Sequence, residues 1–218
     1  PRSTHASRPK ARLAASLLEG ARTVFSSASM RVIVVQNLAM ALFFMGSFVV
    51  TLPLLVRDVF AGSSTDLALM NGVNSFGLLS SIVLLLRFGD VQRPGRALIS
   101  AHIVGSLALA SVGLVGEFMH AVAIMLIWGM CGGIAMAMSR TIMQEQAPPD
   151  QRARVMSFYG FSFMGAGPLG ALLCGLLVEQ FGPQLSLIIC ASSMVAVMFG
   201  LLLFSRLWGL HHHQLRIE

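Results

Sequence analysis

The sequence predicts an all-α membrane protein, built as a bundle of six transmembrane helices. The first observation is composition: 56% of the residues are hydrophobic, only 11% are charged, and the mean hydropathy is +0.78. The second is that the chain contains six apolar stretches of at least 20 residues without Asp, Glu, Lys or Arg. At about 1.5 Å per residue, each is long enough to cross a hydrocarbon core of about 30 Å. These patterns exclude an ordinary soluble domain.

The expected spans follow one another through short connections. They cover residues 32–56, 67–86, 97–116, 118–139, 155–178 and 183–205, within a bundle that extends over residues 32–206. Connections this short favour consecutive spans that lie antiparallel and side by side. We therefore expect no soluble domain between them.

The segment before the first span, residues 1–31, is expected to be a cytoplasmic linker that contains a short amphipathic helix. It begins with polar and basic residues, and the apolar side chains of residues 12–25 then recur at helical spacing. The residues with this spacing are Leu13, Leu17, Leu18 and Val24. Because a linker connects two parts, and because the chain begins with Pro1, we expect it to be the second half of a longer polypeptide.

The basic residues predict the orientation. Fourteen of the fifteen Lys and Arg residues precede the first span or follow the second, fourth or sixth, and only Arg57 lies on the other side. Short loops rich in Lys and Arg stay in the cytoplasm, so both ends of the chain are expected there, including a tail at residues 207–218. These cations flank spans and can contact anionic lipid headgroups, so we expect the lipid bilayer as a partner and no nucleic acid.

Metal and cofactor chemistry is not expected. Cys131, Cys174 and Cys190 all lie inside spans and form no cluster with the spacing of metal ligands. We therefore predict no metal site, no disulfide and no cofactor.

Small residues in the fourth and fifth spans predict close helix packing. In lipid, burial of apolar surface gives little preference for helix over acyl chain, so close backbone contact supplies the attraction between helices. The glycines at such spacing are Gly129, Gly133, Gly167, Gly170 and Gly175. Pro168 removes one backbone donor in the middle of the fifth span, so a kink is expected there.

Two segments resemble the major facilitator superfamily. Residues 87–96 are similar to the loop signature that follows the second span of each half, through Asp90, Arg93, Gly95 and Arg96. Residues 140–157, which contain Arg152 and Arg154, run into the glycine-rich residues 165–175. This second segment resembles the region between the tenth and eleventh spans in a bacterial exporter branch related to siderophore exporters.

The resemblance implies a function. It indicates spans seven to twelve of a twelve-span carrier in a bacterial inner membrane, paired with an amino-terminal six-span half. Such a carrier moves a small-molecule substrate by secondary active transport, here efflux by alternating access, and is not an enzyme. The first, second, fourth and fifth spans would then line the substrate cavity. The candidate cavity residues are Gln36, Asn37, Phe43, Asn71, Asn74, Trp128, Tyr159 and Phe163.

Two titratable residues are expected to be structural. The resemblance places Asp90 beside the start of the fifth span, where it can meet Arg152 or Arg154. His102 is the titratable side chain deepest in a span, but it belongs to the third span, which packs at the periphery in this superfamily. We therefore expect any proton coupling to reside in the amino-terminal half.

Two other classes of membrane protein are alternatives. A permease subunit of the ABC type would need a cytosolic nucleotide-binding partner, and its transport would depend on ATP. An intramembrane protease would need a Gly-x-Ser nucleophile inside a span, paired with a histidine. His102 and His120 are present, but we expect no Gly-x-Ser inside a span.

The orientation can be tested by labelling. In a background that lacks the three native thiols, single cysteines near Ala61 and Gly182 should react with an impermeant reagent in intact cells. Cysteines at Pro149 and His212 should not react. Labelling at position 149 would contradict the topology.

Overall fold

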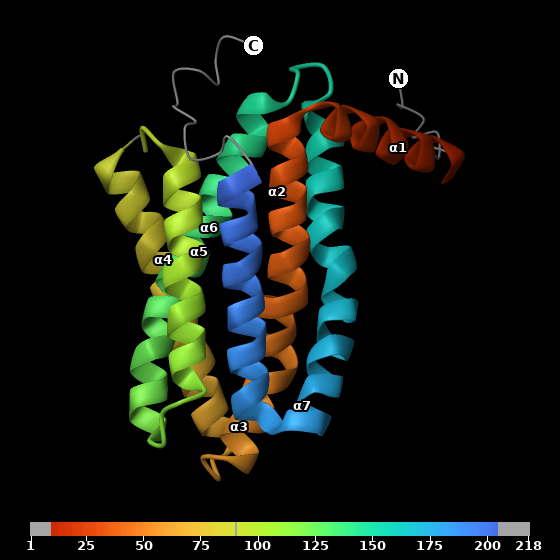
Figure 1. The fold of residues 1–218 in the computed structure, drawn as a ribbon. Helices are drawn as coiled ribbons and strands as arrows, with labels where there is room; N and C mark the ends of the chain where they lie inside the picture. Colours follow the sequence, from red (N-terminus) through yellow and green to blue (C-terminus); the bar gives the residue numbers. More distant parts are fainter. Residues whose placement is uncertain (1–9, 90, 205–218) are drawn as a thin grey trace, which may run out of the picture.

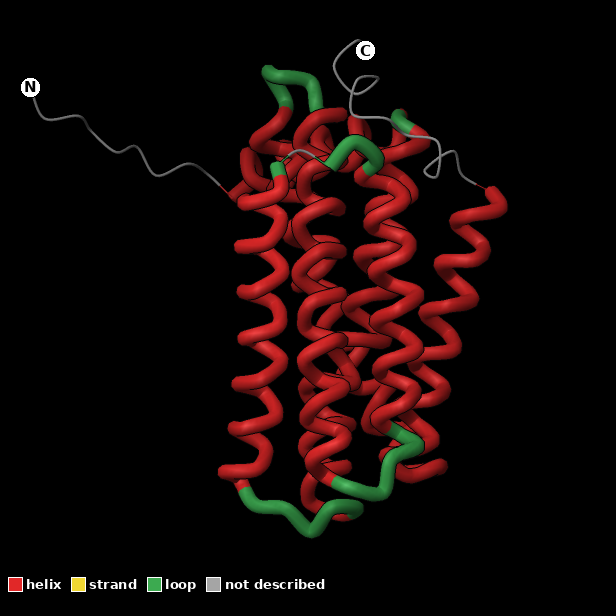
Figure 2. Tube along the Cα trace, turned by 90° about the vertical axis from the view of Figure 1, so that its left-hand side faces the viewer, coloured by secondary structure: helices red, strands yellow, loops and turns green. Residues whose placement is uncertain are grey.

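The fold class predicted from the sequence is confirmed. The computed structural model describes residues 10–89 and 91–204, and these form helices joined by short connections (Figures 1 and 2). The expectations for residues 1–9, Asp90 and the tail at 207–218 lie outside the described residues. The helices are α1 (Lys10–Ser26), α2 (Ala28–Ala39), η1 (Met40–Met45), η2 (Ser47–Thr51), α3 (Leu52–Asp58), α4 (Ser64–Phe88), α5 (Pro94–Val112), α6 (Phe118–Gln146) and α7 (Arg152–Phe204).

The described helices make six passes through the bundle. Five helical segments are long and apolar enough to cross a membrane, and the last of them, Arg152–Leu203, has 52 residues. A straight helix of that length would measure about 78 Å, far more than a bilayer core. Gly182 has non-helical dihedral angles (φ 75°, ψ 168°), and Pro183 follows it. The chain reverses there, so α7 consists of two antiparallel arms (Figure 1).

The first pass contains an irregularity that the sequence did not indicate. α2, η1, η2 and α3 form one helical segment from Ala28 to Asp58, and η1 and η2 are π-helical. Ser47 lies where η2 begins, and its Oγ donates a hydrogen bond to the carbonyl oxygen of Phe43 at 2.6 Å. Such wide turns are rare and often lie at functional sites.

Charges end the apolar stretches but do not end the helices. α6 continues through Arg140 to Gln146, well past the expected boundary at residue 139. It ends at Ala147, which is extended because Pro148 follows it. In contrast, α5 stops at Val112, four residues before the expected end at residue 116, and Gly113 begins a turn.

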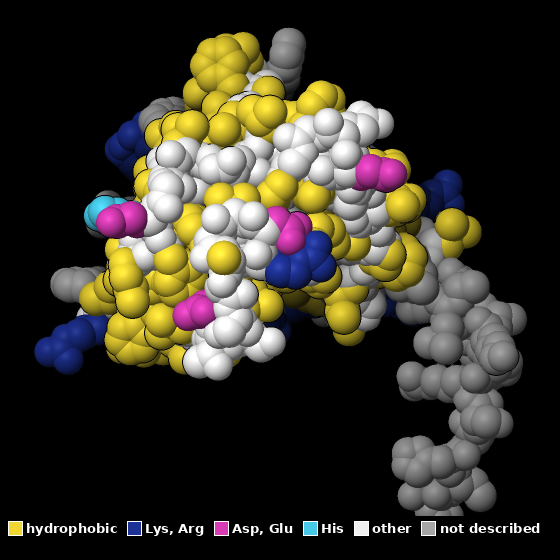
Figure 3. All heavy atoms as spheres, turned by 90° about the horizontal axis from the view of Figure 1, so that it is seen from below, with side chains coloured by type: hydrophobic (Ala, Val, Ile, Leu, Met, Phe, Trp, Pro, Cys, Tyr) yellow, Lys and Arg dark blue, Asp and Glu magenta, His cyan; other side chains and the backbone are white. Residues whose placement is uncertain are grey.

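The two ends of the bundle differ in charge. We call the end beside α1 the upper end and the other the lower end, as in Figure 1. The lower end carries Arg57, Asp58, Asp66, Glu117, His120 and Glu179, which lie near the lower ends of α3, α4, α6 and the first arm of α7. Figure 3 shows this face, on which acidic side chains lie apart from one another among apolar and uncharged groups. Arg57 pairs with Asp58 at 2.5 Å. The other arginines of the described chain lie toward the upper end. The connections that are rich in arginine, which alternate along the sequence with those that are not, therefore lie together at one end of the bundle.

The sharp turns of the lower end affect the labelling test. Ala61 and Gly182 both have positive φ, 48° and 75°. A cysteine would be strained at either position, so their exposed neighbours Ser64 and Gln180 are the better labelling sites.

Helix α1 packs on the start of α7. Glu19 pairs with Arg154 at 2.7 Å, and the rings of Phe25 and Phe158 meet edge to face with centroids 6.1 Å apart. Val24 is fully buried, whereas Leu18 is exposed. Helix α1 thus buries one side chain and exposes another, and it lies across the upper end of the bundle (Figure 1).

Two seams between helices rely on glycine. Along α4 and α6, a Cβ on Gly129 would collide with the carbonyl oxygen of Asn74, and one on Gly133 would collide with Ser81. Along the first pass and the first arm of α7, a Cβ on Gly170 would collide with the carbonyl oxygen of Ala41. The backbones approach this closely only because these positions lack a side chain.

The remaining predicted packing positions differ among themselves. A Cβ on Gly167 would lie 3.3 Å from Sδ of Met45, which is a tight contact. A Cβ on Gly175 would meet nothing within 4 Å. The helix continues through Pro168, and within α7 only Gly182 has non-helical dihedral angles.

The seam between the first pass and α7 yields a matched pair of variants. Gly170→Ala places a methyl group against rigid backbone, so it should lower stability by about 1–3 kcal/mol. Gly175→Ala enters open space on the same helix, so it should leave stability unchanged or raise it by up to about 1 kcal/mol through helix propensity. Thermal unfolding in detergent measures both. Equal melting temperatures for the two variants would contradict the packing argument.

Candidate functional site

The first pass, α4, α6 and the first arm of α7 enclose a groove. It consists of a lower pocket of about 280 Å³ and an upper pocket of about 340 Å³. Met40, Met136 and Phe163 line both pockets, so the two pockets adjoin. Pockets for organic ligands usually measure about 300–1,000 Å³, which makes the combined groove a candidate ligand site.

Five of the eight predicted cavity residues line this groove. Asn74 and Trp128 line the lower pocket, Asn37 and Tyr159 line the upper pocket, and Phe163 lines both. They come from four different helical passes, which the fold brings together.

The other three predicted cavity residues do not line either pocket. Gln36 is buried and contacts α5. Phe43 is half-buried and packs against the apolar core. Asn71 is half-buried on α4, and its buried Oδ1 has no hydrogen-bond partner among the described residues.

The polar side chains of the groove also connect helices. Nδ2 of Asn37 donates to the carbonyl oxygen of Tyr159 and to Oγ of Ser162, both at 3.3 Å, which joins α2 to α7. The Tyr159 hydroxyl lies 3.2 Å from Oγ of Ser139 on α6. Nδ2 of Asn74 donates to the carbonyl oxygen of Met125 at 3.3 Å, which joins α4 to α6. These bonds fix the walls of the groove.

The apolar lining of the lower pocket is aromatic. Trp128 meets the ring of Phe44 edge to face at 5.7 Å, and the ring of Phe48 lies 6.0 Å from it. Trp128 is only 6% exposed, so its ring is held in one position. Such a wall suits a flat apolar group.

Sequence reasoning missed a charged residue in the groove. Arg140 lines the upper pocket, together with Tyr159 and Phe163. The charge of Arg140 ends the apolar stretch 118–139, so the sequence predicts a connecting loop at this position. The structure places it inside α6, six residues before the helix ends. The sequence feature that could have indicated a helical Arg140 is the absence of a helix-breaking residue between it and Pro148.

The residues of the loop motif lie elsewhere. Arg93 is exposed at the start of α5, Gly95 is buried in its first turn, and Arg152 is exposed at the start of α7. Arg96 is half-buried, and Arg154 pairs with Glu19 on α1. The structure does not describe Asp90, so its predicted contact with Arg152 or Arg154 stays a prediction.

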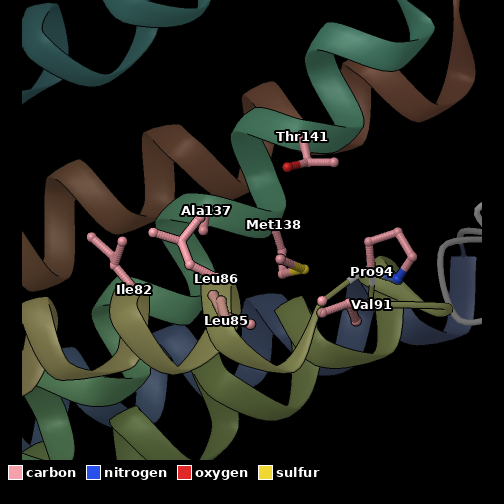
Figure 4. A pocket seen from close by; sticks show the side chains of 9 residues that line it. Ile82, Leu85, Leu86, Val91, Pro94, Ala137, Met138 and Thr141 are labelled. Carbon is pink, nitrogen blue, oxygen red and sulfur yellow. The ribbon is translucent and has the colours of Figure 1, made fainter.

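An apolar pocket of about 350 Å³ lies beside this motif (Figure 4). Val91 lines it from the connection between α4 and α5, and Pro94 lines it from the first turn of α5. Met138 and Thr141 line it from α6. Leu85 and Leu86 of α4 complete the wall. The pocket has no charged lining residue and is separate from the groove.

The described side chains do not form a nucleophile–base pair or a metal site. Gly160-Phe161-Ser162 does have Gly-x-Ser spacing inside α7, which the sequence analysis overlooked. However, Oγ of Ser162 donates to the carbonyl oxygen of Tyr159 and accepts from Asn37, and neither group is a base. Among the described residues, no three His, Cys, Asp or Glu are grouped to hold a metal.

His102 takes part in a buried contact between helices. Its Nδ1 lies 3.0 Å from the carbonyl oxygen of Leu98, and its Nε2 lies 3.1 Å from Nε2 of Gln36. Because a carbonyl oxygen only accepts, Nδ1 carries the proton and Nε2 accepts from the Gln36 amide. The ring also stacks on Phe44, with centroids 6.0 Å apart. Through these contacts, His102 joins α5 to the first pass.

A double-mutant cycle tests that contact. His102→Leu strands the Gln36 amide in an apolar site, so it should lower stability by about 1–3 kcal/mol. The double variant with Gln36→Leu removes both polar groups and should recover a large part of that loss. Ser100→Ala, at an exposed position of α5, is the control and should have little effect. Strictly additive losses in thermal unfolding would show that the two side chains are not coupled.

Comparisons with known proteins agree with this architecture. The family model of the Major Facilitator Superfamily matches residues 1–171 and also residues 39–211. No curated protein and no solved structure matches the chain. Each of the two family matches covers more than half of the 218 residues. The chain therefore belongs to the major facilitator superfamily of multi-pass membrane transporters.

Proposed function

We propose that this chain is the carboxy-terminal half of a secondary active transporter that exports a small organic molecule by alternating access. The groove carries the proposal, because it is a ligand-sized space lined by four helical passes. In carriers built from repeated halves, substrate sites lie near the middle of the membrane at the contact between the halves.

The exposed faces beside the groove support an amino-terminal partner half. α4 is the least buried span, with 17% of its most apolar window buried. Phe76 and Leu79 on α4 are 65% and 60% exposed, and Phe161 and Met164 on α7 are 61% and 74% exposed. A second six-span half packed on these two helices would cover both faces and close the groove between the halves.

The proposed orientation places the upper end in the cytoplasm of a bacterium, at its inner membrane. Its support is the concentration of arginines at that end. The direction of transport, efflux, rests on the resemblance of residues 140–157 to exporters.

Energy coupling is assigned to the other half. Neither pocket of the groove is lined by Asp or Glu. Proton-coupled carriers use intramembrane titratable groups, most often carboxylates. His102 has its ring nitrogens engaged in the contact with Gln36 and Leu98, away from the groove. The coupling carboxylate is therefore proposed to lie in the amino-terminal half.

Dye export tests the proposal. Cells that express the protein should retain less carboxyfluorescein or less rhodamine 6G than cells without it. Phe163→Ala removes a ring shared by both pockets, so it should lower export at least about tenfold, through loss of about 1.5–3 kcal/mol of contact. Phe199→Ala, at an exposed position on the second arm of α7 and outside both pockets, should change it little.

Two outcomes of this experiment would contradict the proposal. One is an equal loss of export in both phenylalanine variants, which would show that export does not depend on a ring that lines the groove. The other is export that continues when a protonophore collapses the ion gradient while ATP is kept constant, which would favour the permease of the ABC type.

A further inference from the structure

We infer that the groove takes an amphipathic organic anion. Its apolar ring system would occupy the lower pocket, and its carboxylate, sulfonate or phosphate would be bound by Arg140 in the upper pocket. The inference rests on the proposed function, since it names the substrate class of the same groove.

The first step is the charge of the lining. Arg140 is the only ionisable Lys, Arg, Asp or Glu among the residues that line the two pockets. The ion pairs of the described chain join Arg57 to Asp58, Glu117 to His120, and Glu19 to Arg154. Within the described residues, Arg140 thus has no carboxylate partner, and its guanidinium offers five donors.

The second step separates Arg140 from an ordinary membrane anchor. Arg87 near the end of α4 is also an exposed cation, but it lines neither pocket of the groove. Arg140 instead shares its pocket with Met136, Tyr159 and Phe163. A guanidinium beside an apolar wall loses hydration when the groove is covered, and an anion restores the lost interaction. Arg is weakly hydrated and binds carboxylates and phosphates through two parallel hydrogen bonds.

The third step concerns the rest of the ligand. The lower pocket offers the rings of Phe44, Phe48 and Trp128 and has no charged lining residue. Methionines line the passage between the pockets, and their flexible side chains adapt to different shapes. The arrangement therefore selects a molecule that is apolar at one end and anionic at the other.

A matched pair of probes tests the charge requirement. 1-Anilinonaphthalene-8-sulfonate is an anion, and N-phenyl-1-naphthylamine is the same ring system without the sulfonate. In a background in which Trp208 and any tryptophan of the amino-terminal half are replaced by phenylalanine, Trp128 is the only donor, so energy transfer from tryptophan reports a probe bound close to the lower pocket. The protein is purified in detergent, and the added variant Trp128→Phe, which has no tryptophan left in this chain, gives the probe emission that does not come from energy transfer.

The expected result is selective. Arg140→Gln should weaken binding of the sulfonate about tenfold or more, because a hydrogen bond to a charged group is lost, and should leave binding of the neutral probe unchanged. Arg140→Lys should retain part of the affinity for the sulfonate. Arg87→Gln should affect neither probe, and an unchanged melting temperature of Arg140→Gln confirms that the protein remains folded.

The outcomes separate this inference from the proposed function. If both probes bind and Arg140→Gln weakens them equally or not at all, the anion inference is wrong and the groove remains a ligand site. If neither probe transfers energy from Trp128 while dye export depends on Phe163, the inference fails and the transport function stands. If neither binding nor export depends on groove residues, both proposals fail.

Discussion

Close contact between backbones at glycine is the interaction on which this structure depends. In lipid, apolar side chains gain little by leaving acyl chains for another helix, so attraction comes from contacts that a Cβ would prevent. Gly129 joins α6 to α4, and Gly170 joins α7 to the first pass. The groove lies where these two pairs of helices meet. Its position therefore follows from these two seams, to which Asn74 and Asn37 add side-chain hydrogen bonds.

Hydrogen bonds between helices explain why the groove is less polar than its sequence suggests. Asn37, Asn74 and Tyr159 line it, yet each directs polar atoms to a neighbouring helix. An amide without a partner in an apolar medium is costly, so the fold uses these groups first for its own contacts. The surface left for a ligand consists mainly of rings and methionines, with Arg140 as the exception.

The sequence was sufficient for the helical class because hydrocarbon admits few backbone conformations. It was insufficient for the faces of the helices. In a membrane helix nearly all sides are apolar, so no hydrophobic periodicity distinguishes a side that faces a groove from one that faces a neighbour. Gln36 and Asn37 are adjacent, yet one contacts His102 on α5 and the other contacts Tyr159 on α7. The π-helical turns of the first pass and the extension of α6 through Arg140 were missed for a related reason, since both depend on packing rather than composition.

The position of Arg140 makes the two ends of the groove differ in charge. The acids Asp58, Asp66, Glu117 and Glu179 lie at the lower end, separated from the upper pocket by much of the bundle. At physiological ionic strength, charges exposed to water are screened within about 8 Å, so these acids contribute little to the potential at Arg140. Inside the covered groove screening is weaker, and Arg140 is the charged residue among those that line the two pockets. Under the proposed orientation, an anion would therefore enter at the cytoplasmic end and bind with its charged group toward that end. Release on the other side would then require separation from Arg140, and a carboxylate brought close to the guanidinium by the partner half would supply the competing ion pair.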